Sequence, residues 1–415
     1  MDRHYLERLG RLEAPFVMDT QGDFPVVIER AQGCSVWDVK GREYLDLTAF
    51  FGAALVGHSN PVVVSAVQKQ AALLMHGMGD VHPPGIKIDF MEALQRSMGV
   101  TDYRFYMGLN GADAVDTALK IAFAATKRPG IIAFDGGYHG LYSGALRATH
   151  RMDFRMPFAD IIGPMARFLP WPDARGHADD MEKATALLKT GEYGAVIIEP
   201  IQGRGGIRAL PNGFLHELQE ITHQYSAIMI ADEIFTGIHR TGPFLASPDQ
   251  GVWPDIICMG KALGGGIPIS VTAAKQDVLG GMGRAKNEAI HTATFISHPL
   301  SAAAGIAVLN ETKRLGLQDR AGQLETAFYE FFNARPWPSA IADIRGKGGM
   351  LAIVLDPGVK AAEIVALHKK IKAAGILVLP AGPNGHVIEV TPPLIIENGQ
   401  FTDALEVIAQ CIAET

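Results

Sequence analysis

Two stretches of the sequence indicate the fold most directly: AIMIADEIFTG at residues 227–237 and DIICMGKALGGGIP at residues 255–268. Each contains an apolar run of strand length that ends at a polar residue or a glycine. Such continuous runs are typical of strands that a sheet buries on both faces. Helix-like amphipathic segments such as residues 112–126 separate these runs from others of the same kind. The alternation predicts an α/β fold with a largely parallel sheet. The other runs lie at residues 104–107, 131–134 and 195–198.

The chain changes its pattern after the Ala-rich helix expected at residues 299–313. Because single cores stop growing at roughly 250 to 300 residues, two domains are expected. Residues 49–305 are predicted to form the large domain, residues 306–415 a small α+β domain, and residues 1–48 a segment that packs with the small domain. The small domain is predicted from strand-like residues 350–355, 376–379 and 387–391, a helix at 361–374 and a turn at 380–385.

Composition narrows the classes of partner. Apolar residues make up 48% of the chain and charged residues 20%, which is ordinary for a soluble globular protein. The net charge of −7 comes with basic residues spread along the chain, so neither nucleic acid nor an anionic membrane is an expected partner. Small molecules are the expected partners.

The expected compartment is the cytoplasm. Cys34, Cys258 and Cys411 are odd in number and far apart, so they form neither a disulfide framework nor a CxxC pair. The N-terminal residues lack the apolar segment of a signal peptide. No apolar run reaches the roughly 18 residues that cross a bilayer.

Three predicted strands are each followed closely by an ionisable residue: Glu199, Asp232 and Lys261. Taken singly, they are read equally well as a turn residue, a helix cap and a solvated lysine. However, the carboxyl ends of parallel strands meet at one crevice. A lysine buried among glycines and apolar residues loses its proton easily and is suited to a Schiff base. A buried Asp232 is suited to hold a protonated pyridine nitrogen, so the pair matches what pyridoxal phosphate (PLP) requires.

A phosphate site is predicted at the small-residue turn around Gly111 and Ala112, between a strand and a helix N-terminus, where backbone N–H groups bind anions. An ordinary strand-to-helix turn is the alternative. The chain contains neither GxGxxG nor GxxxxGK[ST], which disfavours a nucleotide site. Tyr138, after another strand, is a candidate to stack on the pyridine ring, and a half-buried structural tyrosine is the alternative.

Seven motifs in order resemble those of the class III (subgroup II) aminotransferases. The resemblance covers nearly the whole chain and implies fold type I: a large domain with a mainly parallel seven-stranded sheet between helices, plus a small α+β domain from both termini. The motifs are GHSNP at 57–61, NGADA at 110–114, YHG at 138–140, EPIQG at 199–203, ADEIFTGIHRTG at 231–242, GKALGGGIP at 260–268 and TATFISHPLSAAAG at 292–305.

The resemblance also implies roles for single residues. It implies Lys261 as the Schiff-base and proton-shuttling lysine and Asp232 as the partner of the pyridine nitrogen. Thr294 would bind the phosphate from a second subunit, which implies a homodimer with shared active sites. In this family 2-oxoglutarate or pyruvate commonly accepts the amino group. The other cofactor-binding residues that it implies are Gly111, Ala112, Tyr138, Glu199 and Ile234.

The chain departs from the family pattern at positions that bear on the substrate. Phe235 stands where a Gln usually touches the phenolic oxygen of the cofactor, and Leu141 stands where the aminobutyrate enzymes have Arg, which argues against aminobutyrate. Arg204 and Glu389 stand where many members have Glu and Arg, respectively, so the two charges are exchanged. Either Arg204 binds the substrate carboxylate with Glu389 as its gate, or Glu389 binds a cationic group, or the two form a surface ion pair. Phe51 is a further candidate to contact the substrate.

The predicted reaction is therefore transfer of an amino group from an amine or amino acid to a 2-oxo acid through a Schiff base on Lys261 and pyridoxamine phosphate. The related amino-acid and aminolactam racemases (epimerases) also carry Glu before TPPL and are the alternative. They use an Asp acid/base at the position of Arg204, and a guanidinium cannot take a proton, so transamination ranks first. A PLP-binding protein without turnover is the least favoured interpretation.

Overall fold

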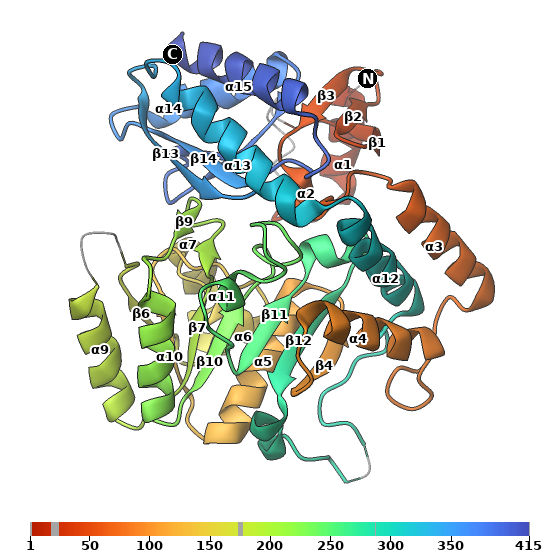
Figure 1. The fold of residues 1–415 in the computed structure, drawn as a ribbon, viewed down its shortest axis with the longest axis vertical. Helices are drawn as coiled ribbons and strands as arrows, with labels where there is room; N and C mark the ends of the chain where they lie inside the picture. Colours follow the sequence, from red (N-terminus) through yellow and green to blue (C-terminus); the bar gives the residue numbers. More distant parts are fainter. Residues whose placement is uncertain (1, 18–24, 173–176, 287, 415) are drawn as a thin grey trace.

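A computed structural model describes residues 2–17, 25–172, 177–286 and 288–414. Its centre is a seven-stranded sheet in which β12 is antiparallel to both neighbours and the other pairings are parallel (Figure 1). The predicted mainly parallel sheet of an α/β fold is thus confirmed. In spatial order the strands are β4 (Tyr103–Gly108), β12 (Ser270–Lys275), β11 (Ile256–Met259), β10 (Ile228–Asp232), β7 (Tyr193–Ile198), β5 (Gly130–Phe134) and β6 (Arg167–Leu169).

The five predicted strands of this sheet are present, whereas β12 and β6 were not predicted. Every residue of β10 and β11 is buried, which explains why their sequences are continuously apolar. Strand β12 contains Ser270 and Thr272, which interrupt the apolar pattern. The Thr272 hydroxyl donates a hydrogen bond to the Ala114 carbonyl, 2.9 Å away, so the helix above the sheet satisfies this buried polar group.

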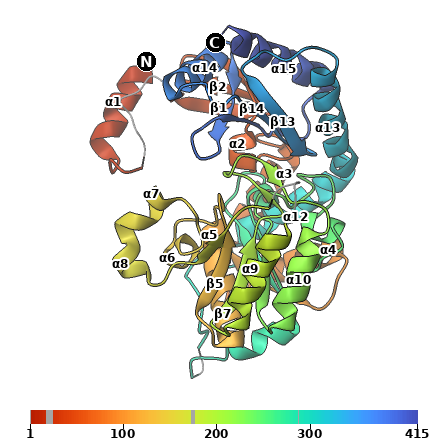
Figure 2. The ribbon, with the colours of Figure 1, turned by 90° about the vertical axis from the view of Figure 1, so that its left-hand side faces the viewer.

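Helices cover both faces of the sheet. On one face α5 (Gly111–Thr126) packs its buried Val115 and Ala118 against the strands. On the other face lie α9 (Ala178–Lys189) and α10 (Phe214–Gln224), which are seen beside β5 and β7 in Figure 2. At the β4 end, three helices pack together beside the sheet: α3 (Pro61–Leu73), α4 (Gly85–Met98) and α12 (Pro299–Arg314).

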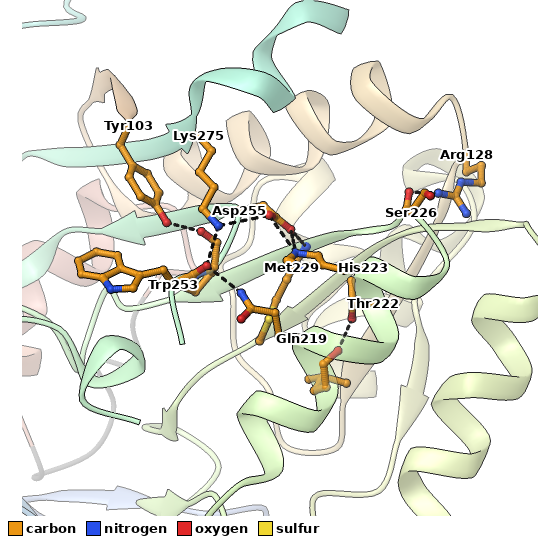
Figure 3. Close-up of polar contacts among 12 residues, drawn as sticks. Tyr103, Arg128, Gln219, Thr222, His223, Ser226, Met229, Trp253, Asp255 and Lys275 are labelled. Carbon is orange, nitrogen blue, oxygen red and sulfur yellow. Dashed lines mark hydrogen bonds and ion pairs between the residues drawn. The ribbon is translucent and has the colours of Figure 1, made fainter. Parts of the chain in front are cut away.

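A polar network around Asp255 holds the start of β11, at the end of the strand opposite Lys261 (Figure 3). The Asp255 carboxylate accepts a 2.8 Å hydrogen bond from the Met229 amide of β10 and pairs with His223 at 3.0 Å. Lys275 of β12 lies 3.7 Å from the same carboxylate. The network therefore links β10, β11, β12 and helix α10 at the edge of the sheet away from Lys261. It fixes the positions of these three strands relative to one another at that edge.

The C-terminal part forms a second, antiparallel sheet with helices α13 (Leu317–Asn333), α14 (Ala361–Ala373) and α15 (Asn398–Ala413) against it. The run at 376–379, predicted as one strand, is divided at Val378 between two sheets, because β15 (Ile376–Leu377) leaves to pair with the N-terminal strands. The sheet order is β13 (Ile341–Lys347), β14 (Met350–Leu355), β17 (Val387–Val390) and β16 (Leu379–Ala381).

The N-terminal strands β1 (Ile28–Gln32), β2 (Ser35–Asp38) and β3 (Glu43–Asp46) form a small sheet with β15, in which β3 and β15 are parallel. Among the described residues, no helix is long and apolar enough to cross a membrane. The remaining elements are α1 (Asp2–Leu12), α2 (Ala49–Gly52), α6 (Ser143–Leu146), α7 (Met152–Arg155), α8 (Ala159–Ile162), α11 (Ala246–Asp249), β8 (Ile201–Gln202), β9 (Arg208–Ala209) and the 3-10 helices η1 (Met156–Phe158), η2 (Lys261–Gly264) and η3 (Gln276–Gly281).

Candidate active site

The carboxyl ends of β7, β10 and β11 bring Glu199, Asp232 and Lys261 together, as the sequence predicts. Glu199 and Asp232 are buried, at 7% and 4% exposure, and both act electrostatically on the Lys261 amine. Three ionisable groups at one buried sheet edge are costly to fold around, so their placement calls for a function in binding or chemistry.

Lys261 has the features of a reactive amine. It is separated from β11 by Gly260 alone and has φ +41°, a left-handed conformation that is strained for a residue with a side chain. Its Nζ lies 3.9 Å from the centre of the Phe235 ring and makes no hydrogen bond within the described part of the chain. Burial lowers the pKa of Lys261, against the opposing charges of Glu389, Asp232 and Glu199. The neutral amine is therefore more accessible than in an exposed lysine.

Asp232 is held by His139, a residue that sequence reasoning did not single out. The His139 Nδ1 and Asp232 Oδ2 lie 2.8 Å apart, and the Ile234 amide donates to Oδ1 at 3.1 Å. Burial alone lowers the pKa of His139, but the hydrogen bond and charge of Asp232, together with the charge of Glu199, raise it above its ordinary value. The only signal for His139 was its place in the YHG turn after a strand.

The N-terminus of α5 offers open hydrogen-bond donors. The Asn110 side chain caps the helix by accepting from the Asp113 amide at 3.0 Å, whereas the amides of Gly111 and Ala112 have no acceptor among the residues that the structure describes. A Cβ at Gly111 would come within 2.9 Å of Ile234 Cδ1, so glycine allows the close approach and a larger residue would displace the Ile234 side chain. These two amides can bind an anion.

Glu199 joins two loops. One of its oxygens accepts from the Tyr138 amide and the other from the Gly203 amide, both at 3.0 Å. Burial raises the pKa of Glu199, and these hydrogen bonds and His139 act in the opposite direction. Since both oxygens already accept from backbone, the clearest role of Glu199 in this geometry is to hold Tyr138 in place.

Arg204 and Glu389 face the same space as Lys261. The Arg204 guanidinium lies 5.8 Å from the Tyr138 ring centre and forms no hydrogen bond or ion pair to any described residue. Glu389 on β17 is 3% exposed and accepts from the Thr391 hydroxyl at 3.0 Å. Burial raises its pKa, and the charges of Lys261, Arg204 and Arg240 oppose this. The surface ion pair considered for Arg204 and Glu389 is therefore wrong, because Glu389 is buried and the two do not pair.

Phe51 and Thr294 lie apart from this cluster. Phe51 is 59% exposed in the left-handed turn of α2, and it lines an apolar cavity of about 470 Å³ with Phe50, Leu377 and Leu379. Thr294 lies on the exposed loop before α12 and makes no hydrogen bond within the described residues. One chain thus supplies the amine, the acid and the helix N-terminus, and leaves Thr294 facing outward.

Comparison with known proteins adds the decisive observation. Residues 17–412 match the family model described as Aminotransferase class-III. The chain belongs to the class III aminotransferases. An acetylornithine aminotransferase of Methanosarcina mazei is 32% identical over 96% of this chain and 94% of its own length. The 5-aminovalerate aminotransferase of Pseudomonas aeruginosa is 33% identical, with 94% of each chain covered.

Solved structures agree with this assignment. The ornithine aminotransferase from Toxoplasma gondii ME49 has a TM-score of 0.86 and 28% identity, covering 100% of this chain and 95% of that one. An amine transaminase from an uncultivated Pseudomonas species, solved in the PLP-bound form, has a TM-score of 0.87 and 25% identity, covering 96% and 98%. This class III aminotransferase is thus a fold type I, PLP-dependent enzyme, and the comparisons favour the aminotransferase over the racemase alternative.

The residues present fit PLP. The aldehyde requires an amine of lowered pKa without competing hydrogen bonds, the pyridine nitrogen requires a buried carboxylate, and the phosphate requires open amide donors. Lys261, Asp232 and the amides of Gly111 and Ala112 meet these requirements. A side chain at position 111 would have to displace Ile234 at the face of the site.

Proposed function

We propose that Lys261 is the residue to which PLP attaches and the base that moves the substrate proton during transfer of an amino group from an amine or amino acid to a 2-oxo acid. The observation that carries the proposal is the part-buried Lys261, whose amine makes no hydrogen bond with a described residue and lies in the field of Asp232, Glu199 and Glu389. Trapping with borohydride tests it: the expected result is a cofactor adduct on residue 261, and an adduct elsewhere would contradict it.

Each residue has a separate task in this proposal. PLP, when bound, supplies an electron sink for the carbon that bears the amino group. Lys261 takes and returns a proton at Nζ, for which its lowered pKa is suited. Asp232, oriented by His139 and the Ile234 amide, holds the ring nitrogen protonated. The amides of Gly111 and Ala112 are proposed to bind the phosphate. Tyr138 and Ile234 are proposed to contact the two faces of the ring, and Glu199 holds the loop that carries Tyr138.

Arg204 is the proposed receptor of the substrate carboxylate. Its guanidinium has no acceptor among the described residues and lies near Tyr138, and arginine binds carboxylates through two parallel hydrogen bonds. Glu389 balances that charge when no carboxylate is bound. Glu389 already faces Lys261, Arg204 and Arg240, so the alternative in which it binds a cationic substrate group is disfavoured.

Arg204→Ala is expected to raise KM for carboxylate-bearing substrates about tenfold to 100-fold, because a hydrogen bond to a charged group is worth about 1.5–3 kcal/mol. KM for an amine without a carboxylate is expected to stay unchanged. Steady-state kinetics with an amino acid and its decarboxylated amine make the comparison, and Arg204→Lys is the matched variant that keeps the charge. An equal change for both substrates would remove Arg204 from carboxylate binding.

A homodimer with shared active sites is proposed, with Thr294 of the partner subunit at the phosphate, and the cytoplasm is the proposed compartment. The support is apolar surface on the loop that carries Thr294 and on the neighbouring 75–81 loop. Phe295 is 52% exposed and Met78 53%, and the loops are joined by a 2.7 Å hydrogen bond between Thr292 and Asp80. Exposed apolar clusters of this kind mark interfaces.

Sedimentation velocity is expected to show a dimer for the wild type. Met78→Asp with Phe295→Asp is expected to shift it toward monomer and to lower activity, because two charges would be buried at the interface. Val365→Asp, at a position 52% exposed on α14, is the control and is expected to stay dimeric. An active monomer would contradict both the dimer and the role of Thr294.

A further inference from the structure

The Phe235 ring is the surface against which the Lys261 amine rests. Phe235 follows Ile234 in the loop after β10 and is 8% exposed. The Lys261 Nζ lies 3.9 Å from the ring centre, which is direct contact with the aromatic face. An aromatic face attracts an ammonium weakly and accepts no conventional hydrogen bond, unlike the Gln that stands at this position in the family pattern.

Two glycines clamp the ring. A Cβ on Gly52 would come within 2.3 Å of Phe235 Cε2, and a Cβ on Gly203 would come within 2.5 Å of Cδ1. Distances this short exclude any side chain at either position unless the ring moves. Gly52 follows Phe51 in the turn of α2, and Gly203 precedes Arg204. The ring therefore connects the Lys261 amine to the α2 turn and to the segment that carries Arg204, the proposed receptor of the substrate carboxylate.

The charged groups that face Lys261 come from four elements. They are Glu389 of β17, Asp232 of β10, Glu199 after β7, and Arg204 between β8 and β9. No hydrogen bond joins any of them to Nζ. With the aromatic face on one side and no hydrogen bond to Nζ from any residue that the structure describes, the amine is held by packing and by charge at a distance.

We propose that Phe235 is a positioning residue for Lys261, holding its amine against an aromatic face without a hydrogen-bond acceptor and coupling it to the Gly52 and Gly203 segments. This rests on the proposed role of Lys261. A polar acceptor at position 235 would stabilise the ammonium directly, so Phe235 also keeps the amine available for attack on a carbonyl.

The test is competitive labelling of lysines with acetic anhydride across pH, read by mass spectrometry on the full-length, PLP-free chain, with the exposed Lys69 as internal reference. Phe235→Gln is expected to move the reactivity midpoint of Lys261 upward by about one pH unit, a tenfold change in proton affinity. Phe235→Leu, apolar but without a π face, is expected to keep the midpoint or lower it. Unchanged midpoints in both variants, or a rise with Leu equal to that with Gln, would overturn the proposal.

Gly203→Ala tests the clamp if the Gln variant does not fold. Its backbone has no positive φ, so alanine is tolerated locally, and the added Cβ displaces the ring without changing its chemistry. The labelling rate of Lys261 and the rate of imine formation after PLP is added are expected to change at least about threefold. Gly322→Ala, where nothing lies within 4 Å of the new Cβ, is the control and is expected to match the wild type. Unchanged rates in Gly203→Ala would overturn the coupling. If borohydride still traps a normal adduct at residue 261 while the reactivity midpoints are unaltered, the positioning role of Phe235 fails and the proposed role of Lys261 stands.

Discussion

Lys261→Ala is expected to lower kcat for transamination by at least about 10⁴-fold, because the variant loses both the amine that attaches the cofactor and the base that moves the substrate proton. Among the residues that the structure describes, the other ionisable groups that face this amine are Glu389, Asp232, Glu199 and Arg204, and none of them supplies a second amine. Single-turnover absorbance of the cofactor with an amino acid donor measures the loss.

Two controls make this result specific. A small external amine such as methylamine is expected to restore part of the proton transfer, because the cavity left by the lysine side chain admits it. Lys261→Arg keeps the positive charge but cannot act as a base, and it is expected to stay inactive without rescue. If Lys261→Ala kept kcat within tenfold of the wild type, another residue would have to perform the proton transfer.

Asp232→Asn is expected to lower kcat by about 10²- to 10⁴-fold and to weaken PLP binding, because a neutral amide does not stabilise a protonated ring nitrogen by charge. The side chain is nearly the same size, and Asp232 is 4% exposed, so packing changes little. His139→Ala is the companion variant. It leaves the carboxylate but removes its 2.8 Å partner, so a smaller loss is expected. A full-speed Asp232→Asn enzyme would contradict the role of this acid.

Asp232→Asn can also be tested by a measurement other than activity. In the wild type, Asp232 raises the pKa of His139 above its ordinary value, so protonation of His139 stabilises the fold below about pH 6.5, and this contribution is lost as pH rises through the raised pKa. Asp232→Asn removes the cause. NMR titration of the His139 ring is expected to show a lower pKa in the variant, and the difference in unfolding free energy between the two proteins is expected to shrink toward high pH.

Sequence reasoning was strongest where a local pattern carries the information. Strands β10 and β11 were predicted because a sheet buried on both faces demands unbroken apolar residues, and Asp232 and Lys261 became candidates from their places at the carboxyl ends of those strands. It was weakest where a residue distant in sequence supplies the hydrogen-bond partner that makes a polar residue acceptable in a buried strand. Strand β12 was not predicted because Thr272 looks polar in sequence, and its hydroxyl becomes acceptable only under the Ala114 carbonyl of α5.

By itself the sequence determined the fold class, because strand burial is encoded within a few neighbouring residues, and its motifs indicated the family. It also predicted Lys261 and Asp232 as the lysine and acid of the proposed site from their places at strand ends. Only the tertiary structure decided that His139 holds Asp232, that Gly52 and Gly203 clamp Phe235 against Lys261, and that Glu389 is buried rather than on the surface. These are contacts between segments far apart in the chain. Their existence depends on how the sheets and loops pack, and no short stretch of sequence contains that information.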